Sequence, residues 1–174
     1  MTADVGAATP PGFLGIVEAL NRHDVRYVVI GGVAAILQGA PLTRTLDLDV
    51  TPAPDRENKR RLAQALADLD ARLRAPGLDE RLEIPLDERT FTGMTTMTFM
   101  TRLGPFDVCF LPDGTDGYDD LARDARTVEF EGVSTPVASL DDIVRSKMAA
   151  RREKDAAHLV ILAEEIRRRR GERA

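Results

Sequence analysis

The sequence contains no tryptophan, and aromatic residues make up only 5% of its 174 residues. Proteins that bind single-stranded nucleic acid without sequence preference stack the bases on exposed aromatic rings. So few rings argue against a base-stacking platform. The chain also has a single cysteine, Cys109, which excludes an intramolecular disulfide and is typical of a protein in a reducing compartment.

Long apolar runs are missing as well. Residues 1–11 contain neither a basic segment nor the apolar stretch of a secretory signal. No run elsewhere has the length of about 20 apolar residues that a membrane-spanning helix needs. We therefore expect a cytoplasmic protein that makes no contact with a membrane.

The length and composition favour one globular domain over residues 1–174, with residues 1–11 flexible. The content of 43% hydrophobic and 30% charged residues lies in the globular range. The net charge is −5, yet residues 143–174 hold 10 Lys and Arg against 5 Asp and Glu. A basic region on an acidic body can bind a phosphate-rich partner locally.

One stretch combines two features that suit phosphate chemistry. A β-rich run over residues 27–30 ends at Gly31 and Gly32, and a short apolar helix with its first N–H groups at Val33 is expected to follow. A second run, residues 45–50, carries Asp47 and Asp49. In a strand these two carboxylates would share one face, while Leu46, Leu48 and Val50 would enter the core.

Paired carboxylates suit Mg²⁺, which binds through one or two carboxylates together with substrate phosphates. The two glycines would let the backbone approach a phosphate closely, and the N–H groups at the start of the helix would donate to it. Alone, each motif is weak, since Gly-Gly is common in turns and Asp-x-Asp can be a solvated strand face. Their order along the chain makes the combination stronger.

This order resembles the minimal nucleotidyltransferase fold of the DNA polymerase β-like superfamily, which begins with a Gly-Gly or Gly-Ser turn, a short helix and Asp-x-Asp. Gly39, with Arg44 and Thr45 leading into Asp47, is most similar to the AbiEii and MenT groups of bacterial toxin nucleotidyltransferases. Many relatives carry a serine where this chain has Gly32. The loop here would therefore rely on backbone donors.

The remaining pattern predicts an α/β (α+β) domain with a mixed sheet and flanking helices. Helices are expected at residues 13–22, 55–73, 118–125 and 139–170, and strands at 95–102, 106–111, 127–130 and 133–137. Residues 75–91 are read as a substrate-facing loop. In the strand 106–111, Asp107 and Cys109 would lie opposite the apolar face, which makes Asp107 the natural third carboxylate.

The last predicted helix, 139–170, opens with Ser139 and Asp142 in a capping box and would complete the active site. On one helix, Lys147, Arg151, Lys154 and His158 would form a nearly straight row beside an apolar stripe. Asp155 falls inside that stripe and needs a cationic partner, either Arg151 or Lys147. The resemblance implies that Lys147 and Asp155 are needed at the active site. His158 is interpreted as a structural or surface residue.

The resemblance implies nucleotidyl transfer, in which a hydroxyl attacks the α-phosphorus of a nucleoside triphosphate and pyrophosphate leaves. The metal ligands for Mg²⁺ or Mn²⁺ would be Asp47, Asp49 and Asp107, with Asp107 as an alternative general base. The catalytic set adds Lys147 and Asp155. Nucleotide contacts are expected from Gly31, Gly32, Val33, Thr45, Lys147 and Arg151.

The implied biological role is that of a toxin in a toxin–antitoxin pair, acting on an RNA such as the tRNA 3′ end, with a cognate antitoxin protein as partner. Phosphates of the RNA would be contacted by Lys154, Arg167, Arg168, Arg169 and Arg170, although these arginines suit a solubilising tail equally well. Alternatives are transfer to a small-molecule drug or to a protein hydroxyl, and a degenerate module that only binds a nucleotide or a partner.

Overall fold

The computed structural model describes residues 5–43, 45–75, 77 and 85–172. Its strands are β1 (Tyr27–Ile30), β2 (Leu48–Pro52), β3 (Arg72–Arg74), β4 (Thr96–Thr101), β5 (Gly104–Cys109), β6 (Arg126–Phe130) and β7 (Val133–Val137). Its α-helices are α1 (Val5–Ala8), α2 (Phe13–Arg22), α3 (Gly31–Leu37), α4 (Arg56–Asp68), α5 (Tyr118–Asp124), α6 (Leu140–Ala150) and α7 (Ala156–Gly171), and a 3-10 turn, η1, covers Glu153–Asp155. None of these helices is long and apolar enough to cross a membrane.

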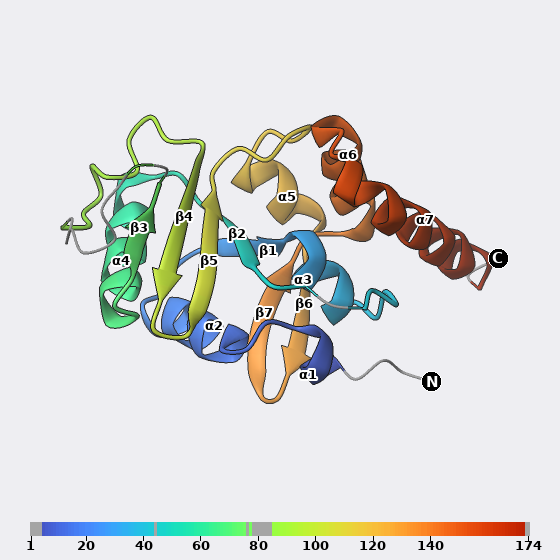
Figure 1. Cartoon of the computed structure of the whole chain (residues 1–174), viewed down its shortest axis with the longest axis horizontal. Coiled ribbons are helices and arrows are strands. Elements are labelled where there is room, and N and C mark those ends of the chain that lie inside the picture. Colours follow the sequence, from blue (N-terminus) through green and yellow to red (C-terminus); the bar gives the residue numbers. More distant parts are fainter. Residues whose placement is uncertain (1–4, 44, 76, 78–84, 173–174) are drawn as a thin grey trace.

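The strands of the described residues form one mixed sheet in the order β3-β4-β5-β2-β1-β7-β6 (Figure 1). The central strand β2 pairs antiparallel with β1 and parallel with β5. Strand β1 in turn pairs parallel with β7. The mixed sheet with flanking helices confirms the fold class that the sequence predicts.

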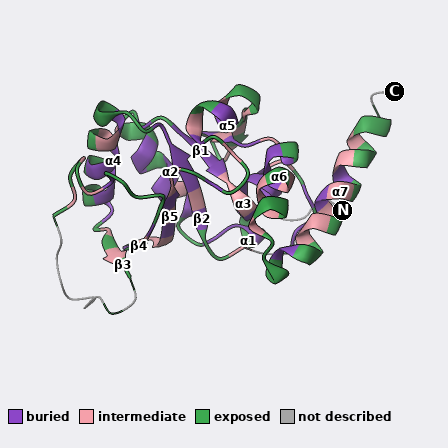
Figure 2. Cartoon of the chain, turned by 90° about the horizontal axis from the view of Figure 1, so that it is seen from above, coloured by how far each residue is buried: buried purple, intermediate pink, exposed green. Residues whose placement is uncertain are grey.

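The core lies on both sides of these central strands (Figure 2). Val29, Val50 and Val108 of three neighbouring strands are completely buried. The helix predicted at residues 13–22 is α2, and its apolar face, including Ile16 and Leu20, packs into the same core. The apolar spacing of this segment therefore determined both its conformation and its buried face.

Asn58 connects helix α4 to the sheet. Its side-chain oxygen accepts from the N–H of Arg26 at 2.7 Å, and its side-chain nitrogen donates to the carbonyls of Arg26 and Ala53 at 2.9 Å each. The backbone N–H of Asn58 donates to Asp55, which caps the start of α4. One buried amide thus fixes the helix against the start of β1 and the end of β2.

Two predicted helices end earlier than expected. Helix α4 stops at Asp68 because Asp70 takes a left-handed conformation (φ 50°), and residues 72–74 continue as edge strand β3 beside β4. The predicted helix 139–170 begins as expected, with Ser139 capping α6 through the N–H of Asp142. It is interrupted after Ala150, where Arg151 is left-handed (φ 51°), and η1 and α7 follow.

Three smaller expectations also change. Strand β2 begins at Leu48, so Asp47 precedes it, and Leu46 is 60% exposed and does not enter the core. Helix α3 begins at Gly31 and not at Val33. Of the segment 1–11, the described residues from Val5 on include helix α1, and Ala8 is buried. Much of the predicted loop 75–91 lies outside the described residues.

Replacing Asn58 by alanine should destabilise the fold by about 2 to 4 kcal/mol, because three hydrogen bonds to buried or partly buried backbone groups are lost together. Chemical denaturation of the two proteins would measure the difference. Gln64→Ala, at an exposed position of the same helix, is the matched control and should change the free energy of unfolding by less than about 0.5 kcal/mol. Equal effects of the two substitutions would contradict this role of Asn58.

Candidate active site

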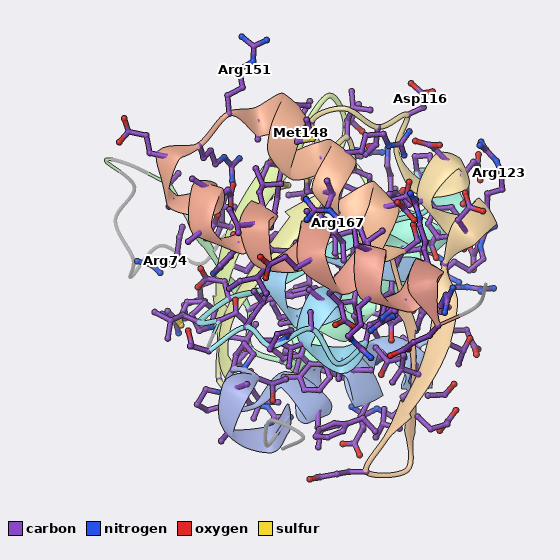
Figure 3. All side chains as sticks on the ribbon, turned by 90° about the vertical axis from the view of Figure 1, so that its right-hand side faces the viewer. Arg74, Asp116, Arg123, Met148, Arg151 and Arg167 are labelled. Carbon is purple, nitrogen blue, oxygen red and sulfur yellow. The ribbon has the colours of Figure 1, made fainter. Side chains whose placement is uncertain are left out.

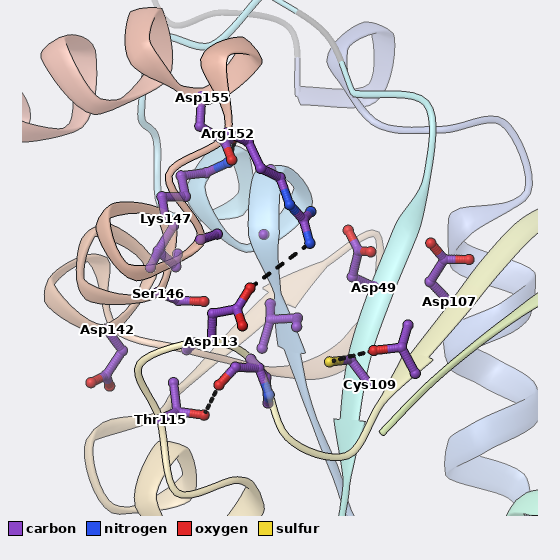
Figure 4. A pocket seen from close by; sticks show the side chains of 18 of the residues that line it. Asp49, Asp107, Cys109, Asp113, Thr115, Asp142, Ser146, Lys147, Arg152 and Asp155 are labelled. Carbon is purple, nitrogen blue, oxygen red and sulfur yellow. Dashed lines mark hydrogen bonds and ion pairs between the residues drawn. The ribbon is translucent and has the colours of Figure 1, made fainter. Parts of the chain in front are cut away.

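Three carboxylates meet at one edge of the central strands. Asp49 of β2 and Asp107 of β5 are direct neighbours in the parallel pairing of these strands, and Asp47 lies just before β2. All three line a cavity of about 760 Å³ that extends to α6 and α7 (Figure 4). The structure therefore brings together the three carboxylates that the sequence singled out.

The two glycines of the β1–α3 junction leave room for side chains of this site. A Cβ atom on Gly31, which has φ +68°, would lie 2.9 Å from Asp49 Oδ2. A Cβ on Gly32 would lie 3.0 Å from the hydroxyl oxygen of Thr45. Both glycines and Thr45 line the cavity. The place that a side chain at position 32 would need is thus occupied by the hydroxyl of Thr45.

The carboxylates repel one another, and burial partly shields them from water. Burial, followed by the charges of Asp107 and Asp47, raises the pKa of Asp49 to about 7. Burial also raises the pKa of Asp107, against a hydrogen bond from Thr98. In addition, Asp107 Oδ1 is buried and has no hydrogen-bond partner among the described residues. A cation bound between Asp49 and Asp107 would relieve this repulsion and give the unpaired oxygen a ligand role.

The carboxylates that line the cavity fit a divalent metal ion that takes its remaining ligands from a bound substrate. Among the described side chains, no group of three or more His, Cys, Asp or Glu residues is arranged to hold a metal ion by itself. Mg²⁺ typically binds through one or two carboxylates plus phosphate oxygens and water. Asp49 and Asp107, with Asp47 nearby, match that incomplete kind of site.

The opposite wall of the cavity carries Lys147, Arg152 and Lys154 together with carboxylates, among them Asp142 and Asp155. Lys147 of α6 donates to Asp155 at the start of α7, and their side chains are only 14% and 8% exposed. Lys154 lines the cavity next to this pair. Its positive charge partly offsets the rise in the pKa of both Asp49 and Asp107, and the charge of Lys147 does the same for Asp49. Lys147 is therefore the partner of Asp155.

The interruption after α6 redirects the side chains that one continuous helix would have aligned. Arg151, predicted to bind the nucleotide, is exposed, points away from the molecule (Figure 3) and does not line the cavity. Arg152 lines it instead. Val33 is fully buried in the core and also lies outside the cavity. Contacts of the nucleotide with Arg151 and with the backbone N–H of Val33 stay predictions, and the orientation of Arg151 away from the cavity does not support the first of them.

The arginines of the C-terminal helix divide into two kinds. Arg168 and Arg169 form ion pairs with the buried Glu165 at 2.7 and 2.6 Å, and Arg169 also donates to the carbonyl of Gln38 at the end of α3. Arg170 pairs with Asp141 at 2.9 Å. Arg167 lies on the exposed side of α7 (Figure 3). Arg169 and Arg170 thus connect α7 to the end of α3 and to α6, whereas Arg168 pairs within its own helix.

No protein-family model matches this sequence, and a search of curated proteins finds no significant match. Solved structures do match. TM1012 from Thermotoga maritima, described as a candidate nucleotidyltransferase, is 21% identical, with a TM-score of 0.55 over 88% of this chain and 91% of that one. The lincosamide antibiotic adenylyltransferase LnuA, bound to lincomycin, is 13% identical, with a TM-score of 0.60 over 87% and 94%.

The antibiotic-resistance factor ANT(2'')-Ia is also 13% identical, with a TM-score of 0.56 over 89% of this chain and 83% of that chain. The chain has the nucleotidyltransferase fold. At these identities the likeness concerns the fold, and the chemistry depends on the residues of the cavity.

Several residues that line the cavity were not predicted as part of the site. Arg152, Asp113, Ser146 and His158 come from the turn after α6, the loop after β5, α6 and α7. The Nδ1 atom of His158 is buried, and no residue in the described part of the chain forms a hydrogen bond with it. No local motif marks these residues, and only the break in the predicted helix 139–170 turns Arg152 into the cavity. Cys109, expected beside the site, does line it.

Asp49→Asn should stabilise the metal-free protein at pH 8, by about 2 to 4 kcal/mol, and have little effect near pH 4. An unfolded Asp loses its proton near pH 4, whereas folded Asp49 keeps its proton up to about pH 7. The wild-type free energy of unfolding therefore falls as pH rises through this window. The asparagine variant does not carry this penalty, and urea denaturation at both pH values would measure the difference.

Asp116→Asn, in the exposed loop before α5, is the control and should show no such pH dependence. Mg²⁺ should raise the melting temperature of the wild type more than that of the Asp49 variant. A stabilisation of equal size at both pH values would show that charge repulsion at Asp49 is not the cause.

Proposed function

We propose that this chain is a metal-dependent nucleotidyltransferase that moves a nucleoside monophosphate from a nucleoside triphosphate to a hydroxyl group. The observation that carries the proposal is the neighbouring pair Asp49 and Asp107, with a raised pKa and an unpaired buried oxygen, beside the glycine turn. Without a cation between them, these two neighbouring carboxylates repel each other. Mg²⁺ or Mn²⁺ together with a triphosphate would satisfy it.

In this reaction the acceptor oxygen forms a bond to the α-phosphorus, and the bond from that phosphorus to the pyrophosphate oxygen breaks. When bound, the divalent metal would neutralise phosphate charge and lower the pKa of the attacking hydroxyl. Asp47, Asp49 and Asp107 would hold it. Alternatively, Asp107 would act as the general base that takes the proton of the acceptor hydroxyl.

The rest of the cavity would position the triphosphate. Gly31 and Gly32 leave the backbone accessible, and the hydroxyl of Thr45 can donate to a phosphate oxygen from the space beside Gly32. Lys147 supplies positive charge toward Asp49 from its buried pair with Asp155. In this arrangement Asp155 would hold Lys147 in place, so both residues are needed without both touching the nucleotide.

For the acceptor we propose an RNA, with the 3′ end of tRNA as the first candidate and a toxin role, held in check by an antitoxin protein, as its biological setting. Lys154 at the cavity and the exposed Arg167 on α7 are the cations available for an RNA backbone. The resemblance of residues 31–49 to toxin nucleotidyltransferases supports the same acceptor.

A small-molecule hydroxyl is the second candidate acceptor. Two of the similar structures are an adenylyltransferase of lincosamide antibiotics and an antibiotic-resistance factor. The ion pairs of Arg168, Arg169 and Arg170 within this chain also leave fewer cations for RNA. A protein hydroxyl as acceptor, or binding without transfer, would be distinguished by the same experiment.

Incubation of the purified chain with Mg²⁺, each α-labelled nucleoside triphosphate in turn and total tRNA should label tRNA with at least one nucleotide. Asp49→Ala should reduce labelling by more than about 100-fold, since it removes a metal ligand, whereas Asp116→Ala should leave it unchanged. Chelation of the metal should abolish labelling in both active proteins. Label on protein instead of RNA would indicate a protein acceptor.

Absence of label on tRNA and protein, with label appearing on an added antibiotic that carries hydroxyl groups, would favour the small-molecule acceptor. Nucleotide binding with no transfer to any acceptor would favour a degenerate binding module. A protein that binds none of the four nucleotides in the presence of Mg²⁺ would contradict the proposed function.

Charge reversal on α7 separates the two acceptor classes. Arg167→Glu should weaken tRNA binding about 3- to 10-fold and flatten its dependence on salt if the acceptor is RNA. Arg169→Glu should instead lower the melting temperature, because it places a carboxylate against the buried Glu165. Arg89→Glu, an exposed arginine beside α4, is the control. Equal effects of Arg167→Glu and Arg89→Glu on tRNA binding would argue against a specific RNA contact.

A further inference from the structure

Three side chains with permanent positive charge line the cavity among the described residues, namely Lys147, Arg152 and Lys154. In the ligand-free protein these three side chains have different contacts. Lys147 is held by the buried Asp155. If it moved to a phosphate, Asp155 would remain as a buried carboxylate without its partner, which is unfavourable. Lys147 is therefore poorly suited to bind the nucleotide directly.

Lys154 acts on the carboxylate end of the cavity. Its charge lowers the pKa of both Asp49 and Asp107, which places it toward the metal-binding side. Of the three cations, Arg152 is therefore the one best suited to bind phosphates that lie away from the metal-binding side.

Arg152 is held only weakly. Its guanidinium lies 4.0 Å from the carboxylate of Asp113, and the two side chains are 60% and 59% exposed. This contact joins the turn between α6 and η1 to the loop between β5 and α5, on the cavity side of both (Figure 4). An exposed ion pair at this distance contributes little to stability, so a stronger anion can displace Asp113.

A guanidinium suits such an anion. It presents parallel N–H donors that bind two oxygens of a phosphate at once, and it keeps its charge at every relevant pH. The left-handed backbone of Arg151 directs that residue away from the molecule, while Arg152 follows with an extended backbone and faces the cavity. The chain thus offers two adjacent arginines of which one lies at the site.

We propose that Arg152 binds the phosphate chain of the nucleotide donor, and that Asp113 competes for this arginine in the nucleotide-free protein. The inference rests on the proposed function, because the donor is a nucleoside triphosphate. When the nucleotide binds, Arg152 leaves the carboxylate of Asp113 and contacts oxygens of the phosphate chain instead. Asp113 then becomes free at the mouth of the cavity.

The test compares nucleotide affinities of the full chain with Mg²⁺ and without an acceptor, so that the donor is not consumed. Each nucleoside triphosphate is titrated by calorimetry, and inorganic tripolyphosphate serves as a probe without a base. Arg152→Ala should weaken binding about 10-fold or more, as expected for loss of charge-assisted hydrogen bonds. Arg151→Ala, the matched control, should change it less than about twofold. Arg152→Lys should restore part of the affinity.

Asp113→Asn provides the second arm of the test. It should tighten binding about threefold by removing the competitor, and this gain should disappear in the Arg152→Ala background, as in a double-mutant cycle. All these positions are exposed, so unchanged melting temperatures would confirm that the variants are folded.

Two results would overturn the inference and leave the proposed function standing. One is equal affinity of the Arg152→Ala and Arg151→Ala proteins for triphosphate. The other is an Asp113→Asn gain of the same size with and without Arg152, which would mean that the aspartate only repels anions. Absence of triphosphate binding by the wild type would overturn both.

Discussion

The parallel pairing of β2 with β5 is the constraint on which the candidate site depends. It places Asp49 directly beside Asp107, although burial and mutual repulsion oppose two neighbouring charges. The register is kept by the other face of the same strands, where Val50 and Val108 are completely buried. A shift of one residue would exchange the two faces and bury the carboxylates in the core. The apolar core thus imposes the unfavourable arrangement that a cation would relieve.

The second wall depends on an interruption of helical structure. Between α6 and α7 the chain reverses its local conformation at Arg151, and the pair of Lys147 with Asp155 holds the two helices on either side. The cavity therefore combines carboxylates carried by strands with a helix side that holds Lys147, Arg152 and Lys154 beside Asp142 and Asp155. In the proposed reaction, the metal and the phosphates would be contacted from these two sides.

Much of this architecture could be predicted from the sequence, because it depends on local signals. The apolar spacing of α2, the glycines after β1 and the alternation that sets Asp107 apart from the core are all short-range patterns. The helix break could not be predicted in the same way. Residues 139–170 have good helical periodicity, and the interruption depends on a left-handed arginine and on an ion pair that forms only in the folded protein. The placement of Arg152 follows from this break, and Leu46 is exposed because it lies before the start of β2.

The order of the elements along the chain has a consequence for synthesis. The carboxylates lie within residues 47–107, whereas Lys147 and Asp155 come from α6 and η1 much later in the chain. Strand β7, the parallel neighbour of β1, also follows the carboxylate strands. The three carboxylates are therefore synthesised before Lys147, Arg152 and Lys154, whereas Arg74, whose charge opposes the raised pKa of Asp107, is made earlier. The proposed nucleotidyl transfer would therefore require that synthesis has passed η1, because Lys147, Arg152 and Asp155 line the cavity.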